Sequence, residues 1–279
     1  MLTRALQWLL QWRWLRERLA FALARQHYPS LNIRVPLSGG LTAPVTSEEA
    51  WLSFSEIFLQ GEYDSVWAHL PLPDRWLDLG CHAGYFSLHC ESRRRSEKRM
   101  TAAEALLVDA DPRSVLAVER MIFENKLAGK LKFQHGAVGS GDASVPFFQR
   151  PFMSSGVAGL DGTPGHALSV PVVAPEQILA LLPPPYDLIK VDIEGSEYDF
   201  VEFYEAVWNK ARHVLIECHE TAGSGRTLAD GMDWIIRRTG FERLSLGEVA
   251  GDPTRRAALL LLRRPEGWMP AKALAQTSA

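Results

Sequence analysis

The chain has 279 residues, 47% of them hydrophobic, so it can bury a substantial core in one large domain or two small ones. Its formal net charge of −3 argues against nucleic acid as a partner, because the chain carries no overall positive field. The three cysteines Cys81, Cys90 and Cys218 include no C-x-x-C pair. They therefore predict neither a disulfide framework nor a zinc site, and they favour a reducing, cytoplasmic location.

The first part of the chain, residues 1–72, is expected to be a helical extension. Residues 5–26 combine tryptophans and leucines with several arginines, which is typical of a basic amphipathic helix. Three interpretations remain open: the helix packs on the domain, lies peripherally on an anionic membrane surface, or makes a dimer contact. A second helix is predicted to begin at Thr46 or Ser47 and to end at Gly61. No apolar run is long enough to predict a transmembrane helix.

Strands and helices are predicted to alternate from Arg75 onward. Apolar, strand-like stretches occur at 75–80, 105–110, 130–138, 186–193, 213–218, 241–246 and 257–262. Helical patterns occur between them at 84–95, 113–126, 175–182, 196–209 and 227–239. This order predicts an α/β fold with a seven-stranded, mostly parallel Rossmann-like sheet. Because the strands are apolar throughout, helices should cover both faces of the sheet.

The alternation defines one domain over 73–265, followed by a tail over 266–279. The stretch 139–172 is rich in Gly, Pro and Ser and is predicted to be an insertion that forms a β-hairpin. The charged run 91–99 is interpreted as a solvated helix face without a function.

A glycine turn follows the first predicted strand of the sheet. Asp78, Gly80 and Gly84 stand where the strand passes into a helix, and ligands of open α/β sheets bind beyond such carboxyl ends. The glycines allow a tight turn and a close approach of the next helix. The spacing matches neither the G-x-G-x-x-G of dinucleotide-binding proteins nor a P-loop, so the turn alone does not identify a ligand.

The second predicted strand ends in Asp109. A carboxylate at this position can accept both hydroxyls of a ribose, which predicts a nucleoside-containing ligand. Asp111 precedes Pro112 and is interpreted as a helix cap instead.

Acidic residues crowd the end of the fourth predicted strand. Asp192 and Glu194 repel each other there, so a functional role is favoured for both. Glu197 is explained by charge pairing at a helix N-terminus. The fifth strand brings Glu217 and His219 to the same edge, where His219 is either a general base or an ordinary satisfied polar residue.

Several of these segments together resemble the FkbM-type methyltransferases. The stretch 78–87, "DLGCHAGYFS", is similar to the family's D-x-G-A-N-x-G-x-x-S turn, and 109–112, "DADP", to its E-P-x-P. Residues 123–140 are similar to its N-x-L…A-V-G-D run, and "SSG" at 154–156 to its Ser-Ser loop. The most specific match is 189–202, "IKVDIEGSEYDFVE", to I-K-I-D-V-E-G-x-E. The resemblance spans about Gly61 to Leu246.

The resemblance implies an S-adenosylmethionine-dependent methyltransferase that acts on a hydroxyl of a small molecule, natural product or glycan. It places the methionine part of the cofactor at the glycine turn and Asp109 on the ribose. The cofactor-binding residues that follow are Asp78, Gly80, His82, Gly84, Asp109 and Ala137. His82 stands where the family has Asn.

For catalysis, we expect Asp192 or His219 to be the base and Glu194 to orient the acceptor. No metal is expected in this interpretation. The alternative is a magnesium or manganese ion held by Asp192, Glu194 and His219. Two other functions remain: a nicotinamide-dependent oxidoreductase, which lacks its glycine motif here, and a non-catalytic nucleoside-binding module.

Overall fold

The computed structural model describes residues 33–99, 101–140, 143–149, 166–220, 227–248 and 257–267. The basic segment 5–26, the Ser-Ser-Gly segment 154–156 and the tail from residue 268 lie outside these ranges, so the predictions made for them stay predictions. Within the described residues, no helix combines the length and the apolar character that crossing a membrane requires.

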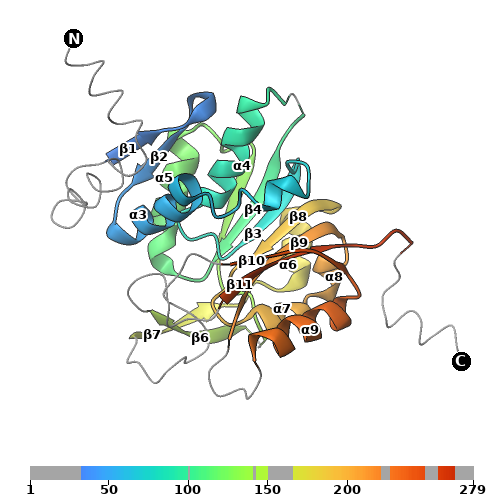
Figure 1. The fold of residues 1–279 in the computed structure, drawn as a ribbon. Coiled ribbons are helices and arrows are strands. Elements are labelled where there is room, and N and C mark those ends of the chain that lie inside the picture. Colours follow the sequence, from blue (N-terminus) through green and yellow to red (C-terminus); the bar gives the residue numbers. More distant parts are fainter. Residues whose placement is uncertain are drawn as a thin grey trace, which may run out of the picture.

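A seven-stranded sheet runs through the middle of the domain (Figure 1). Its order is β10-β11-β9-β8-β3-β4-β5. The strands are β3 (Arg75–Leu79), β4 (Glu104–Asp109), β5 (Leu131–His135), β8 (Tyr186–Val191), β9 (Ala211–His219), β10 (Glu242–Glu248) and β11 (Ala257–Arg263). Only the pairings of β11 with β9 and β10 are antiparallel in this sheet. The predicted seven-stranded, mostly parallel Rossmann-like sheet is thus confirmed.

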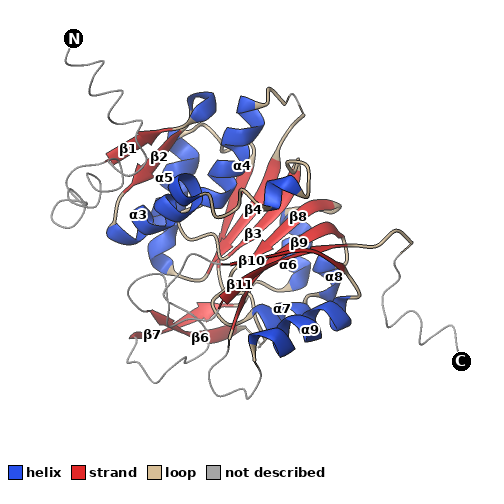
Figure 2. Ribbon diagram, viewed as in Figure 1, coloured by secondary structure: helices blue, strands red, loops and turns tan. Residues whose placement is uncertain are grey.

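Helices cover both faces of this sheet (Figure 2). They are α4 (Tyr85–Ser96), α5 (Pro112–Glu124), α6 (Pro175–Leu181), α7 (Glu197–Phe203), α8 (Glu205–Trp208) and α9 (Leu228–Thr239). Side chains of β3 alternate between two cores: Trp76 packs with α4 and α5, while Leu77 and Leu79 pack with α6 to α9. Burial on both faces explains why the strands are apolar throughout.

The region before the sheet differs from the expected helical extension. Strands β1 (Ile33–Pro36) and β2 (Thr42–Val45) form an antiparallel hairpin around a short 3₁₀ turn (Ser38–Gly40). Tertiary packing accounts for this hairpin, because Ala43 and Val45 are buried and Asn125, directly after α5, bonds the Thr42 backbone.

The helix predicted after this hairpin is confirmed. Ser47 caps α3 (Glu48–Phe54) by accepting from the Ala50 N–H at 3.0 Å. The chain continues as a π-helical turn, η2 (Ser55–Gln60), and stops at Gly61, which has φ of 74°. A short 3₁₀ helix, η3 (Val66–Ala68), leads on toward β3.

The predicted insertion contains the expected hairpin, formed by β6 (Ser144–Gln149) and β7 (His166–Pro171).

The prediction of a solvated helix face for the charged run 91–99 was wrong at two charged positions. Glu91 and Arg94 are each only 2% exposed. Arg94 donates to the backbone carbonyls of Pro73 and Thr101, while Glu91 accepts from Lys130. This part of α4 therefore ties the helix to its neighbours instead of facing solvent.

Candidate active site

The glycine turn after β3 lies directly against the end of β8. Gly80 has φ of 76°, and a Cβ there would lie 1.6 Å from the backbone oxygen of Asp192. Gly84 also has φ of 76°, and its Cβ would lie 2.4 Å from Cε of Met121. No larger residue fits at Gly80 without moving one of the two strand ends, so glycine is required by both conformation and space.

His82 occupies the middle of this turn with φ of 48°, a left-handed conformation that Asn and His tolerate better than most residues. Its Nδ1 is buried and has no hydrogen-bond partner among the described residues. Burial lowers the pKa of the imidazole, so His82 is neutral at ordinary pH. An orphaned buried nitrogen is the type of atom that a ligand lying against the turn would satisfy.

Asp109 braces the same turn from the end of β4. Its Oδ2 accepts from the His82 N–H at 2.6 Å, and its Oδ1 accepts from the Asp111 N–H at 2.8 Å. Each carboxylate oxygen can accept a second bond, so a ribose contact remains compatible with this bracing. Asp111 caps α5 by accepting from the Arg113 N–H, as predicted.

A cavity of about 440 Å³ opens beside the turn. It is bounded by the start of α3, by His82 and Ala83, and by the start of α5 from Asp111. The first turns of two helices and the glycine turn thus face one concave space.

Asp78 and Ala137, two of the predicted cofactor-binding residues, each form a hydrogen bond with a neighbouring segment. Asp78 is completely buried, and its Oδ2 accepts from the Ser87 hydroxyl at 2.7 Å. Ala137 lies just beyond β5, and its N–H bonds the Pro171 carbonyl at 2.8 Å. Asp78 thus ties the end of β3 to α4, whereas Ala137 packs in a small core with β6 and β7. The contacts of both residues with a cofactor stay predictions.

Lys190 joins the glycine turn to the acidic strand end, a role that the sequence analysis missed. Its Nζ donates to the Gly80 carbonyl at 3.0 Å and to Oδ2 of Asp192 at 2.9 Å. Oδ1 of Asp78 lies 3.8 Å away. Burial alone would lower the pKa of Lys190, but the attraction of Asp192 and Asp78 outweighs it and raises that pKa. The lysine therefore stays charged.

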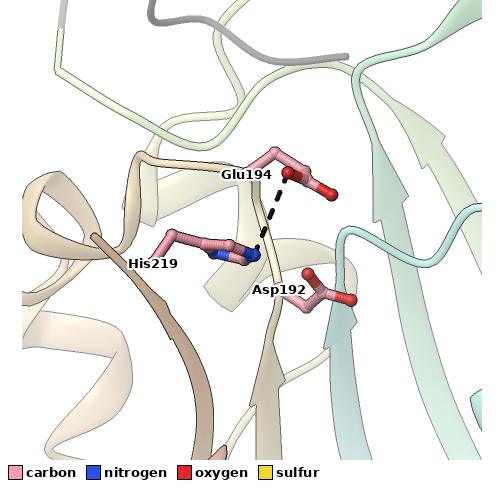
Figure 3. Close-up of side chains that lie close together, drawn as sticks. All are labelled: Asp192, Glu194 and His219. Atoms are coloured by element: carbon pink, nitrogen blue, oxygen red, sulfur yellow. Dashed lines mark ion pairs between the residues drawn. The ribbon is translucent and has the colours of Figure 1, made fainter. Parts of the chain in front are cut away.

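The residues predicted at the ends of β8 and β9 converge. Asp192, Glu194 and His219 each contribute one ligand-type atom to a group in which all three lie within 4.8 Å of one another. Figure 3 shows the imidazole beside both carboxylates, with Glu194 and Asp192 on successive parts of the strand end. Parallel pairing of β8 with β9 produces this convergence, because it aligns the two carboxyl ends.

Glu197 binds the imidazole of His219 at Nδ1, the ring nitrogen that faces away from the cluster. Its Nδ1 lies 2.9 Å from Oε1 of Glu197, a residue that is fully buried. On the other side of the ring, Nε2 lies 3.4 Å from Oε1 of Glu217 and 3.9 Å from Oε2 of Glu194. Burial alone would lower the pKa of His219, but Glu197 and then Glu217 outweigh it and raise that pKa well above its usual value. The sequence pattern explains Glu197 only by its place at a helix start and does not predict this contact.

Two further carboxyl groups near this cluster come from the segment before the sheet. The pKa of Glu56 rises to about 7 and that of Glu62 to about 8. Burial is the main cause in both cases, followed by repulsion from Glu217 and Asp192. Glu56 lies in the π-helical turn η2, a type of helix found often at functional sites.

Neither protein-family models nor curated protein sequences match the chain. Among solved structures it is similar to PH0793 of Pyrococcus horikoshii, with 12% identity, a TM-score of 0.48, and coverage of 90% of this chain and 82% of that one. Precorrin-6y C5,15-methyltransferase of Geobacter metallireducens shows 11% identity, a TM-score of 0.45, and coverage of 75% and 91%. TrmK of M. capricolum, in complex with S-adenosylhomocysteine, shows 9% identity, a TM-score of 0.44, and coverage of 73% and 67%. At these identities and TM-scores the likeness assigns neither activity nor substrate.

Proposed function

We propose that the protein is an S-adenosylmethionine-dependent methyltransferase of the FkbM type that methylates a hydroxyl of a small molecule. One observation carries this proposal: the glycine turn and the cluster of Asp192, Glu194 and His219 are contiguous, with Gly80 packed against the Asp192 backbone. A turn suited to a nucleoside cofactor thus adjoins side chains suited to act on an acceptor.

The turn and its surroundings fit the cofactor. Gly80 and Gly84 let the turn pack closely against the end of β8 and against α5, and Nδ1 of His82 offers an unpaired polar atom. Asp109 at the end of β4 keeps acceptor capacity for a ribose. In this proposal these residues hold S-adenosylmethionine together with Asp78 and Ala137. When bound, the cofactor supplies an electrophilic methyl group on a sulfonium.

The side chains at the ends of β8 and β9 position the acceptor and handle its proton. Asp192 or His219 takes the hydroxyl proton, His219 only from its neutral form because its pKa is raised, and Glu194 orients the acceptor. Lys190 fixes the Asp192 carboxylate, and Glu197 fixes the plane of the imidazole. Holding acceptor and methyl donor in line supplies a large part of the rate enhancement in such a displacement.

Ligand-induced thermal stabilisation tests the proposal directly. A ligand that binds only the native state raises its melting temperature, so S-adenosylhomocysteine should stabilise the protein and NAD should not. A methyl-transfer screen over sugars, polyketides, fatty-acid derivatives and phenols then identifies the acceptor. Stabilisation by NAD alone would favour the oxidoreductase. Cofactor binding without transfer to any acceptor class would favour a non-catalytic nucleoside-binding module.

A further inference from the structure

Three side chains that can ligate a metal ion meet at the ends of β8 and β9. The candidate ligand atoms of Asp192, Glu194 and His219 all lie within 4.8 Å of one another. Octahedral coordination with bonds of about 2.1 Å places neighbouring ligand atoms about 3 Å apart and opposite ones about 4.2 Å apart. Small side-chain rotations would therefore bring all three atoms onto one ion. We propose that this cluster binds a divalent metal ion.

The orientation of His219 supports the site independently of the distances. The side chain is 8% exposed, and the hydrogen bond of its ring among the described residues joins Nδ1 to Glu197. Nε2 instead faces the cluster, 3.9 Å from Glu194 and 3.4 Å from Glu217. Both distances exceed those of an ordinary hydrogen bond. A metal-binding histidine almost always donates its other ring N–H to a carboxylate, a backbone carbonyl or water, and Glu197 is in that position here. Figure 3 shows the imidazole facing Glu194 and Asp192.

The local charge also favours a cation. Carboxylates of Glu194, Glu197 and Glu217 lie around the imidazole, and Asp192 completes the cluster on the other side. Lys190 lies 2.9 Å from the Asp192 carboxylate and supplies one positive charge. A divalent ion would offset the remaining negative charge, and bound divalent ions are often the largest local charges of such sites.

The donor atoms indicate which ion fits. Two carboxylates favour hard ions such as Mg²⁺ and Mn²⁺, whereas an imidazole is a ligand more typical of transition metals. Mn²⁺ accepts both kinds of donor, so it is the ion we expect to bind and the probe of choice.

The ion would give the site a way to bind the acceptor, and this role rests on the proposed function. A metal ion that binds a hydroxyl oxygen lowers the pKa of that hydroxyl. Asp192, Glu194 and His219 would then act on the acceptor through the ion. Acceptors with two neighbouring oxygens, such as vicinal diols or hydroxy acids, could chelate it.

Electron paramagnetic resonance of Mn²⁺ tests the site on the full-length protein without cofactor or acceptor. The signal of free Mn²⁺ should fall during titration as one ion binds per chain. Asp192→Asn, Glu194→Gln and His219→Gln should each weaken binding by about tenfold or more. Modulation from the imidazole ¹⁴N should appear in the pulsed spectrum of bound Mn²⁺ and disappear in His219→Gln.

The matched control is Glu202→Gln on α7. It removes an exposed carboxylate that pairs with Arg238 of α9, so this variant should bind Mn²⁺ like the parent. Circular dichroism confirms that each variant is folded. The near-isosteric Asp192→Asn keeps the test valid if His219→Gln does not fold. No saturable binding by the parent, or equal binding by all three variants, would overturn the proposal. Because methyl transfer is not measured, this result is independent of a failure of the proposed activity.

Discussion

Glu197 connects the imidazole of His219 to the turn that follows β8. Its Oε1 lies 2.9 Å from Nδ1 of His219, and its two oxygens accept from the Gly195 N–H at 3.0 and 3.1 Å. The side chain is completely buried, so water cannot replace either contact. A single carboxylate therefore fixes both the ring plane of His219 and the backbone that carries Glu194.

Replacing Glu197 should cost stability in proportion to the contacts removed. Glu197→Ala leaves a buried imidazole without its partner, so the free energy of unfolding should fall by about 3–5 kcal/mol. Glu197→Gln keeps one acceptor oxygen and should cost less. Urea denaturation measures both, with Glu202→Ala on the exposed face of the same helix as the control. Equal losses for Glu197→Ala and Glu202→Ala would contradict this role.

The contact between Gly80 and Asp192 predicts that alanine is not tolerated in the turn. A Cβ at Gly80 would lie 1.6 Å from a backbone oxygen, and φ is 76° there. Gly80→Ala should abolish S-adenosylhomocysteine binding and lower the melting temperature, because the turn must move. Gly129→Ala is the matched control, since nothing lies within 4 Å of the Cβ it introduces. Thermal shift with and without ligand checks both; intact ligand binding by Gly80→Ala would show that the cofactor lies elsewhere.

Asp109 should contribute to cofactor binding through hydrogen bonds to its carboxylate. Asp109→Ala removes charge-assisted bonds to the ribose and should weaken S-adenosylmethionine binding by about 1.5–3 kcal/mol. It also removes the acceptors for the His82 and Asp111 N–H groups, so some loss of stability is expected as well. Calorimetry separates the effects, with Glu104→Gln at the start of β4 as the control. Unchanged affinity in Asp109→Ala would exclude this placement of the ribose.

The sheet could be predicted from sequence because its strands are apolar runs separated by helices of sufficient length. The hairpin of β1 and β2 could not, because each strand has four residues and contains a proline, Pro36 or Pro44. Its strands form because buried side chains and Asn125 hold them, and those partners lie far away in sequence. Local patterns do not contain that information.

Some residues of the candidate site could likewise be predicted from sequence, and others could not. Asp192, Glu194 and His219 could be predicted because parallel strands bring their carboxyl ends to one edge. Lys190 could not be identified, since its role depends on the register that places it beside Gly80 and Asp78. Glu56 comes from a segment outside the sheet, and nothing in its local sequence predicts which carboxylates it approaches.

His89 predicts a specific sensitivity to acid. Burial, and then repulsion by Arg93, lowers the pKa of His89 from 6.5 to about 4, with a small opposing effect of Asp64. The native state therefore keeps the ring neutral while the unfolded chain binds a proton below pH 6.5. Stability from this residue is complete above pH 6.5 and is lost as the pH falls toward 4, by about 2–3 kcal/mol near pH 4.5.

Phenylalanine at this position removes the titration and keeps the ring contacts with Phe58 and Trp67. His89→Phe should therefore lose about 2–3 kcal/mol less than the parent between pH 7.5 and 4.5 in urea unfolding. His69→Phe, at an exposed position, controls for the added phenylalanine. An identical pH dependence in the parent and His89→Phe would show that His89 does not titrate as described.

Asp192 and His219 are expected to act on the acceptor and not on the cofactor. They close neighbouring strands on the β8 side of the glycine turn, whereas Asp109 lies on the β4 side. Asp192→Asn and His219→Asn should therefore reduce turnover while S-adenosylhomocysteine affinity stays nearly intact. Loss of a general base costs about 10²–10⁴-fold. The exposed Asp233→Asn on α9 makes the same charge change and should leave turnover unaltered.

The effect of a chelator on the parent and on these two variants distinguishes whether Asp192 and His219 act through a bound metal ion or act directly on the acceptor. If Asp192 and His219 hold a divalent ion, a chelator should abolish turnover in the parent, and added Mn²⁺ should restore it. In the variants, added Mn²⁺ should restore turnover only weakly, because one of the metal ligands is missing. If they act directly, the parent should retain its turnover in the chelator while both variants remain impaired. Full turnover by both variants on a confirmed acceptor would contradict either role, and positioning by the remaining side chains would then account for the reaction.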